Sequence, residues 1–432
     1  MGHELKRFSF LARSICLDTI GRRLRINVLR DGHSAPERTY LRGNIEKDER
    51  SMPYEVSIHR CDSYDDPKVS KAVEASLAPL GRLESVIKAT DRVLIKLNLL
   101  SAKPPEAAVT THPAVVRATI NLVQELGATP VVGDSPGGGS TRASYKKLLE
   151  KTGIRQVVED TGCELVRFDE ATLEVASDKA KTFKKLTLAK AVTEADVIIG
   201  LPKLKTHSLT YYTGAVKLLY GYIPGMFKTE FHLHTARDIK LFADLLLDLH
   251  ETYPPALTIM DAIVGMEGDG PSNGNPRKIG LVLASKSCTA LDYVAVTIAG
   301  FDAMSVPTVK LAQERGIGPA RLEDIELFGQ RVEPLIMGDF EKTSTTSLSR
   351  APSFLVNSLK RFMAVKPVIN ASKCVRCGEC FKDCPPKAMT FAKAEGPTID
   401  YGKCIRCYCC QELCPEGAIT VSTPVVRRLL KR

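Results

Sequence analysis

Short apolar runs alternate with amphipathic segments through most of the chain, and this alternation predicts its architecture. Residues 92–98, 129–135 and 163–169 have the length and β-branched content of buried strands. Residues 111–128 place apolar side chains at helical spacing, begin with Thr and Pro, and end beside Gly127. Because short apolar strands alternate with helices, we predict an α/β fold with a mostly parallel sheet covered by helices on both faces. Further strands are predicted at 52–66, 194–207, 256–265 and 278–287, and further helices at 141–153, 236–251 and 288–300.

Composition divides the chain into five segments. Residues 1–51 are polar, arginine-rich and weakly periodic, so we expect a poorly ordered N-terminal extension that contributes little to the fold. Residues 52–334 carry the α/β pattern and form the predicted body. Residues 335–370 are a predicted linker that ends in a short helix. A cysteine-rich domain at 371–425 and a basic tail at 426–432 follow.

Two cysteine runs near the C-terminus share one spacing, C-x2-C-x2-C-x3-C-P. This repeated run is the ligand pattern of bacterial two-cluster ferredoxins, in which the fourth cysteine of each run binds the other cluster. The spacing therefore predicts two 4Fe–4S clusters in a small C-terminal α+β ferredoxin domain. One cluster is predicted to bind Cys374, Cys377, Cys380 and Cys414, and the other Cys404, Cys407, Cys410 and Cys384.

Structural zinc and disulfides are the alternatives for so many cysteines. Zinc sites use paired C-x2-C sequences rather than triple runs closed by Cys-Pro. Disulfides would require closely spaced cysteines to find distant partners, in a chain without a secretory signal. Cys409 lies outside the ligand spacing, and we expect it to be a buried, apolar thiol. A tuning role beside a cluster is the alternative for this residue.

Net charge and cysteine spacing limit the possible binding partners and the cellular compartment of the protein. The net charge is +10, but the basic residues are spread along the chain without a nucleic-acid-binding module, so no nucleic acid is expected as a partner. A basic surface would attract an acidic electron carrier, such as ferredoxin or flavodoxin, or a small anionic substrate. Alternatively, it offsets the negative charge of the clusters. No apolar run reaches 18 residues, so no membrane span is expected, and singly scattered cysteines favour a reducing, cytoplasmic location.

Polar residues gather where the predicted strands end, which is where open α/β sheets bind ligands. After the strand that ends near Gly200, Pro202 makes a helix unlikely, and alternation then places Lys203, Lys205 and His207 on one side of an extended segment. Two ammonium groups and an imidazole repel one another unless an anion lies between them. The predicted catalytic residues are therefore Lys203, Lys205, His207, Lys217 and Asp261, with Asp261 as the built-in counter-ion.

Two other interpretations of these residues remain open. The first is a charged, solvated loop in which none of the five residues meet. The second is a metal site formed by His207, His232, His234 and Asp261, although the segment around residue 232 reads as a loop entering a helix. Two glycine-rich loops, 133–141 and 265–277, match neither nucleotide-binding motif, so we interpret them as walls of a pocket.

The body resembles a known family, domain of unknown function family 362, over about residues 54 to 425. Family members often carry a C-terminal two-cluster ferredoxin, so the resemblance implies a redox protein of the kind found in anaerobes. The segments that carry the resemblance are VLIKLNLL, THPAVVRATINLVQELGATPVVGDSPGG, GLPKLKTHSLTYYTGAVKLLYG, DAIVGMEGDGPSNGNPRK and LASKSCTALD.

Two functions follow from these observations. The first is an iron–sulfur oxidoreductase that passes single electrons through two 4Fe–4S clusters to or from a small anionic substrate at the strand ends. The second is a non-enzymatic electron-transfer or adaptor protein whose body docks a redox partner. Converging acids and bases favour the enzyme, because a docking surface does not need them.

The cysteine assignment predicts an iron content. Anaerobically purified protein should carry about eight irons per chain, four for each cluster. Cys409→Ser should keep this content, whereas Cys407→Ser and Cys384→Ser should damage the same cluster. Iron analysis of the purified variants tests the assignment, which is wrong if Cys409→Ser loses half the iron and Cys410→Ser loses none.

Overall fold

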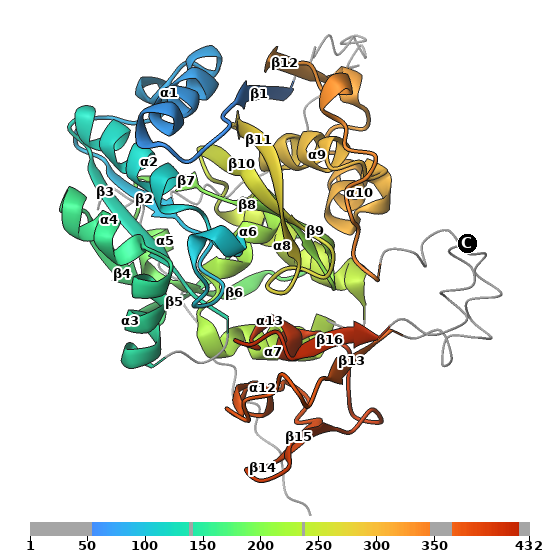
Figure 1. Ribbon diagram of the computed structural model, residues 1–432. Coiled ribbons are helices and arrows are strands. Elements are labelled where there is room, and N and C mark those ends of the chain that lie inside the picture. The colour runs from blue at the N-terminus through green and yellow to red at the C-terminus, as the bar shows by residue number, and fades with distance from the viewer. Residues whose placement is uncertain (1–53, 138–140, 236–237, 346–364, 423–432) are drawn as a thin grey trace, which may run out of the picture. The chain divides into compact units, whose positions relative to one another are not determined.

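The computed structural model describes residues 54–137, 141–235, 238–345 and 365–422 (Figure 1). The predicted extension at 1–51 and the predicted tail at 426–432 lie outside the described residues. So does the linker between 346 and 364, where the short helix is expected.

Ten strands form the main sheet, and most neighbouring pairs are parallel. Two strands are exceptions. Strand β11 runs antiparallel to both of its neighbours, and strand β9 runs antiparallel to β8. The predicted α/β class with a mostly parallel sheet is confirmed. The strand order is β12 (Ile325–Gly329), β1 (Tyr54–Arg60), β11 (Asn275–Ser285), β10 (Leu257–Glu267), β7 (Val197–Gly200), β2 (Arg92–Lys96), β3 (Thr129–Asp134) and β4 (Glu164–Arg167).

Helices bury both faces of this sheet, as Figure 1 shows. Within β2, Val93 and Ile95 pack into the core on one face, while Leu94 packs into the core on the other. Burying each such side chain contributes roughly 1.5–3 kcal/mol, which explains why the central strands are apolar throughout. The first face is covered by α1 (Asp66–Leu77), α2 (Pro113–Glu125), α3 (Arg142–Lys151) and α4 (Ile154–Thr161). The second is covered by α6 (Ala215–Leu218), α8 (Ile239–Thr252), α9 (Cys288–Ile298) and α10 (Pro307–Glu314).

The strand predicted at 194–207 is two strands, and this division positions the polar side chains. β7 ends at Gly200, and β8 (Lys203–His207) begins after Pro202. Leu201 still donates its N–H to the carbonyl of Lys96 in β2, but beyond Pro202 the chain pairs with β10 and with β9 (Tyr211–Thr213) instead. The segment 203–207 therefore extends past the ends of β2 and β7. The sequence analysis also missed the hairpin of β5 (Thr172–Ala176) and β6 (Lys185–Ala189), as well as α4, α5 (Lys190–Thr193), α10 and β12.

The cysteine-rich region has two similar halves. Each half supplies a four-residue helix, α12 (Glu379–Lys382) or α13 (Cys409–Glu412). Two small sheets surround these helices: β13 (Lys366–Ile369) pairs with β16 (Ile419–Ser422), and β14 (Met389–Ala392) pairs with β15 (Gly396–Ile399).

The loop between β10 and β11 fastens α13 to the body. The Ser272 hydroxyl donates to the carbonyl of Glu412 at 2.8 Å, and the Asn273 amide donates to the carbonyl of Gln411 at 2.8 Å. In return, the Gln411 amide donates to the carbonyl of Asp269 at 2.9 Å. This glycine-rich loop thus holds helix α13 against the body.

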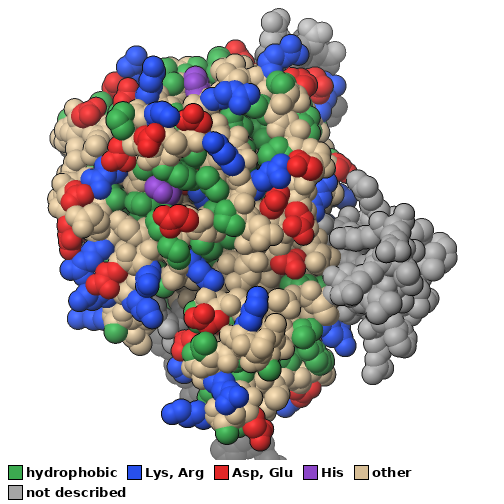
Figure 2. All heavy atoms as spheres, viewed as in Figure 1, with side chains coloured by type: hydrophobic (Ala, Val, Ile, Leu, Met, Phe, Trp, Pro, Cys, Tyr) green, Lys and Arg blue, Asp and Glu red, His purple; other side chains and the backbone are tan. Residues whose placement is uncertain are grey.

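Surface charge is mixed on the face shown in Figure 2, where Lys and Arg side chains are interspersed with Asp and Glu. Among the described residues, no helix has the length and apolar character needed to cross a bilayer.

A buried carboxylate holds the turn that carries Lys217. Asp292 accepts hydrogen bonds from the backbone N–H groups of Ala215 at 2.6 Å and Val216 at 2.9 Å, and from the Tyr212 hydroxyl at 3.1 Å. Gly214 is required beside it, because a Cβ there would collide with the Asp292 carboxylate. Burial raises the pKa of Asp292 to about 7. Between about pH 4 and 7 the folded state therefore holds a proton that the unfolded state has lost, so the free energy of unfolding falls as the pH rises through this range.

Asp292→Ala should lower the free energy of unfolding by about 3 kcal/mol, because two buried N–H groups lose their acceptor. Asp302→Ala is the control, since that exposed carboxylate accepts from only Met304 at the start of a short helix and its loss should cost about 1 kcal/mol. Chemical denaturation measures both values. Equal losses in the two variants would contradict the anchoring role of Asp292.

Candidate functional site

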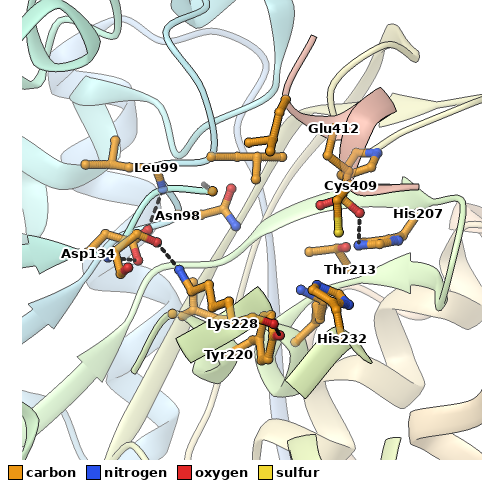
Figure 3. Close-up of a pocket in the computed structure, with 18 of the residues that line it drawn as sticks. Asn98, Leu99, Asp134, His207, Thr213, Tyr220, Lys228, His232, Cys409 and Glu412 are labelled. Carbon is orange, nitrogen blue, oxygen red and sulfur yellow. Dashed lines mark hydrogen bonds and ion pairs between the residues drawn. The ribbon is translucent and has the colours of Figure 1, made fainter. Parts of the chain in front are cut away.

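A cavity of about 100 Å³ lies between the strand ends of the body and helix α13 (Figure 3). Helix α7 (Gly225–Thr235) and the turn at α6 form its other walls. We call this cavity the basic pocket, because its lining includes Lys96, Lys205, Lys217, Lys228, His207 and His232. Its acidic lining residues are Asp134, Asp383 and Glu412.

One side of the basic pocket is a closed network of paired groups. Lys96 Nζ lies 2.6 Å from Asp134 Oδ1, and Asp134 also accepts from the backbone N–H groups of Leu99 and Ser135. Lys228 donates to the carbonyls of Ser135 and Pro136. Burial lowers the pKa of Lys228 to about 7. These two lysines are therefore held by protein groups and chiefly shape the wall.

Lys205 is buried beside this wall. Its ammonium donates to Asn98 Oδ1 at 2.9 Å and to the carbonyl of Val109. Burial, assisted by the nearby charge of Lys217, lowers the pKa of Lys205 to about 7. The residue thus exchanges its proton near neutral pH.

Lys217 has neither a hydrogen bond nor an ion pair within the described part of the chain. Its Nζ lies over the Tyr220 ring, 4.6 Å from the centroid, and 5.7 Å from the centroid of Phe242. Burial lowers the pKa of this lysine, which means that its environment does not fully compensate the charge. An ammonium group that faces a cavity without a counter-ion is suited to binding one carboxylate or phosphate group of a ligand.

The opposite wall brings an imidazole to a carboxylate. His207 Nδ1 accepts from the backbone N–H of Leu209 at 3.0 Å, so the proton of the neutral ring resides on Nε2. That Nε2 lies 3.3 Å from Glu412 Oε1. Burial lowers the pKa of His207 and raises the pKa of Glu412 to about 6. The two shifts leave His207 neutral and make Glu412 the group of this pair that gains or loses a proton near pH 6.

Lys203 and Asp261 lie in a separate cluster. Lys203 Nζ lies 2.8 Å from Asp261 Oδ2 and 2.7 Å from the Tyr64 hydroxyl, which also donates to Asp261. The Tyr64 ring stacks on His112 at 3.5 Å. Both charges of the pair are buried and satisfied by each other, and neither residue lines the basic pocket. The pair has the properties of a structural ion pair at the end of the sheet.

The proposed four-residue metal site is not assembled. Asp261 lies in the cluster with Lys203, and His207 Nδ1 is occupied by a backbone N–H. Residues 232 and 234 are on a helix, so His232 faces the basic pocket while His234 is exposed.

The cysteines line two further cavities of about 20 Å³ each, one for each predicted ligand set. The first is lined by Cys374, Cys377, Cys380 and Cys414, and the second by Cys384, Cys404, Cys407 and Cys410. Backbone N–H groups of Ala418 and Ala388 donate to the Sγ atoms of Cys414 and Cys384, at 3.2 Å in each case. Four thiols around each cavity, with N–H groups directed at sulfur, fit the donor requirements of a 4Fe–4S cluster. Cys409 lines neither cavity but the basic pocket.

Two parts of the chain match known protein families. The family described as domain of unknown function (DUF362) matches residues 93–297, and a 4Fe-4S dicluster domain matches residues 373–418. The thylakoid-associated protein sll1697 of Synechocystis is 36% identical over 272 residues, which are 63% of this chain and 83% of that protein. The chain belongs to the DUF362 family. Its C-terminal region is a 4Fe–4S ferredoxin-like domain, as predicted from the cysteine spacing.

Solved structures show weaker similarity to this DUF362 protein. The lactate racemase apoprotein of Thermoanaerobacterium thermosaccharolyticum is 14% identical, with a TM-score of 0.35 and 54% of each chain covered. A protein of Thermotoga maritima is also 14% identical, with a TM-score of 0.32, and the match covers 48% of this chain and 52% of that one. The chain thus spans about half the length of these solved chains.

Of the five predicted catalytic residues, the structure brings Lys205, His207 and Lys217 together and leaves Lys203 and Asp261 outside. Their catalytic role remains a prediction. Sequence reasoning missed Lys228 and Glu412. Lys228 resembles an ordinary helical lysine, and Glu412 occupies an unconstrained position between two ligand cysteines, so no local signal marks either residue.

Sulfate binding should fall as the pH rises from 6 to 9, because Lys205 and Lys228, with pKa values of about 7, lose their charges. Sulfate keeps its own charge over this range, so titration calorimetry reports the protein groups alone. Lys217→Met should weaken sulfate binding by at least about tenfold, the cost of one charge-assisted hydrogen bond. The exposed Lys310 provides the control variant Lys310→Met, which should bind as the unmodified protein does. Binding that is independent of pH, or equal in the two variants, would rule out the basic pocket as the anion site.

Proposed function

We propose that this protein is an iron–sulfur oxidoreductase that passes single electrons through two 4Fe–4S clusters to or from a small anionic substrate in the basic pocket. One observation carries the proposal. Helix α13 begins between two ligand cysteines, and its residues Cys409 and Glu412 form a wall of the pocket that contains Lys217. The electron source and the anion site would therefore lie on the two sides of one helical turn.

Substrate binding would rest on Lys217, which has no hydrogen bond or ion pair among the described residues and lies over two aromatic rings. Lys205 lies beside it and would gain a proton when an anion enters, because negative charge favours the ammonium form. The cavity of about 100 Å³ suits a molecule of a few heavy atoms, far smaller than a nucleotide. We infer a small carboxylate or phosphate ester whose anionic group contacts Lys217.

Proton transfer would rest on His207 and Glu412. When bound, the clusters supply electrons one at a time. Reduction of a double bond consumes two electrons and two protons, and the His207 Nε2–H faces the cavity beside a carboxylate that is protonated below about pH 6. Glu412 would deliver the protons one at a time, regaining each from solvent, while the His207 Nε2–H orients its carboxylate. In the oxidative direction Glu412 would accept them.

The surface of the ferredoxin-like domain supports an acidic electron carrier as the partner. Val375 is 61% exposed and Phe381 is 40% exposed, close in sequence to the exposed ligand Cys377. Lys373 and Arg376 flank them and are also exposed. The same exposed apolar side chains favour the second candidate function, an electron-transfer or adaptor protein without a substrate. We retain a cytoplasmic location as a proposal, whereas the Synechocystis relative is a thylakoid-associated protein.

In the test, the anaerobically purified protein is reduced with dithionite and mixed with a metabolite extract. Mass spectrometry then identifies any metabolite that the protein converts. We expect an anionic species shifted in mass by two hydrogens, formed equally by the control Lys310→Met. Lys217→Met should form it at least about tenfold more slowly, as expected from the loss of one charge-assisted hydrogen bond.

Two outcomes would contradict the proposal. If the unmodified protein converts nothing while its clusters remain reducible, the electron-transfer or adaptor function is favoured. If Lys217→Met converts the species at the unmodified rate, the substrate binds elsewhere.

A further inference from the structure

Cys409 lies next to a cluster ligand. It is buried and packs with Cys407 and Ile405 in one small apolar group. This packing places the Cys409 thiol beside the Cys407 side chain, where it can donate a hydrogen bond to the ligand sulfur. Because the ligand sulfur is a thiolate when a cluster is bound, the Cys409 thiol is the donor in this contact.

The same residue faces the basic pocket. Figure 3 shows the Cys409 sulfur directed toward Thr213, with His207 and Glu412 beside it. Thr213 is 3% exposed, and its hydroxyl is buried and has no hydrogen-bond partner within the described residues. A buried, unpartnered hydroxyl costs free energy unless something in the cavity bonds to it. Thr213 is therefore an independent indication that a polar ligand occupies the space beside Cys409.

The two ligand sets differ in their relation to this pocket. The set containing Cys407 and Cys410 flanks Cys409 directly, and Pro385, adjacent to the ligand Cys384, also lines the pocket. In the other set, Cys377 is exposed to solvent. The two clusters would thus face different surroundings, one toward the pocket and one toward solvent.

We propose that Cys384, Cys404, Cys407 and Cys410 hold the substrate-side cluster, and that Cys409 is a positioning residue that links occupancy of the basic pocket to the reduction potential of that cluster. The proposal rests on the proposed function and adds an order to it. Electrons enter at the cluster bound by Cys374, Cys377, Cys380 and Cys414, and leave through the cluster beside Cys409.

The link follows from the charges involved. A hydrogen bond donated to a ligand sulfur stabilises the reduced, more negative cluster and raises its potential. An anion in the pocket opposes that extra negative charge and lowers the potential. Since the Cys409 thiol contacts both sides, a ligand that reorients the thiol toward itself also removes the hydrogen bond from Cys407.

Redox titration of the reconstituted full-length protein, followed by electron paramagnetic resonance, tests the proposal. Cys409→Ala should lower one midpoint potential and leave the other unchanged, with full iron content. Cys409→Ser, which keeps a hydroxyl donor, should restore most of the lost potential. Sulfate is the probe anion, and it should lower the same midpoint potential in the unmodified protein but less in Cys409→Ala.

A marker variant identifies the responding cluster. Cys377→Ser alters one ligand of the solvent-side cluster, so the potential that it perturbs should be the one that Cys409→Ala leaves unchanged. The proposal is overturned if Cys409→Ala moves neither potential, moves both equally, or moves the potential marked by Cys377→Ser. Failure of the proposed function would appear differently, as an absence of sulfate binding or substrate conversion while the potential still responds to Cys409→Ala.

Discussion

The attachment of helix α13 to the loop between β10 and β11 is the contact on which the candidate site depends. Three hydrogen bonds join the side chains of Ser272, Asn273 and Gln411 to backbone carbonyls on the opposite side of the contact. Each bond contributes only about 1 kcal/mol, but together they fix the position of a four-residue helix that could not hold a geometry alone. Without this attachment, the basic pocket would lose the wall formed by Cys409 and Glu412.

Electrostatics sets the character of the basic pocket. Burying several lysines is costly, and the protein reduces that cost by pairing Lys96 with Asp134 and by giving Lys205 and Lys228 carbonyl or amide acceptors. Lys217 differs from them, because its nearest partners in the described part of the chain are the rings of Tyr220 and Phe242, and the charge of Glu412 acts on it without a direct ion pair. This contrast within one cavity distinguishes wall residues from the residue that we expect to meet a ligand. It also explains why a net charge of +10 spread over the whole chain says less about function than one unpaired ammonium group.

Sequence reasoning reached the fold class and the 4Fe–4S ferredoxin-like domain, because buried parallel strands and cluster ligands follow strict local patterns. It was less successful in predicting which residues line the basic pocket. Alternation places Lys203, Lys205 and His207 on one side of β8, and Asp261 was expected as their counter-ion. The sequence could not reveal that Asp261 pairs with Lys203 alone and that this pair lies outside the pocket. Glu412 was beyond reach for a different reason, and so was the place of Cys409 in the pocket wall. Their importance arises only when residues 140 or more positions apart in the chain meet, as the contact of Ser272 with Glu412 shows.

An anaerobic crystal structure of the full chain soaked in selenate would test the central claim most directly, because iron and selenium give separate anomalous signals. The account predicts iron at both cysteine sets and selenium beside Lys217, against the wall formed by Cys409 and Glu412. Iron at only one set, or selenium bound away from that wall, would contradict it.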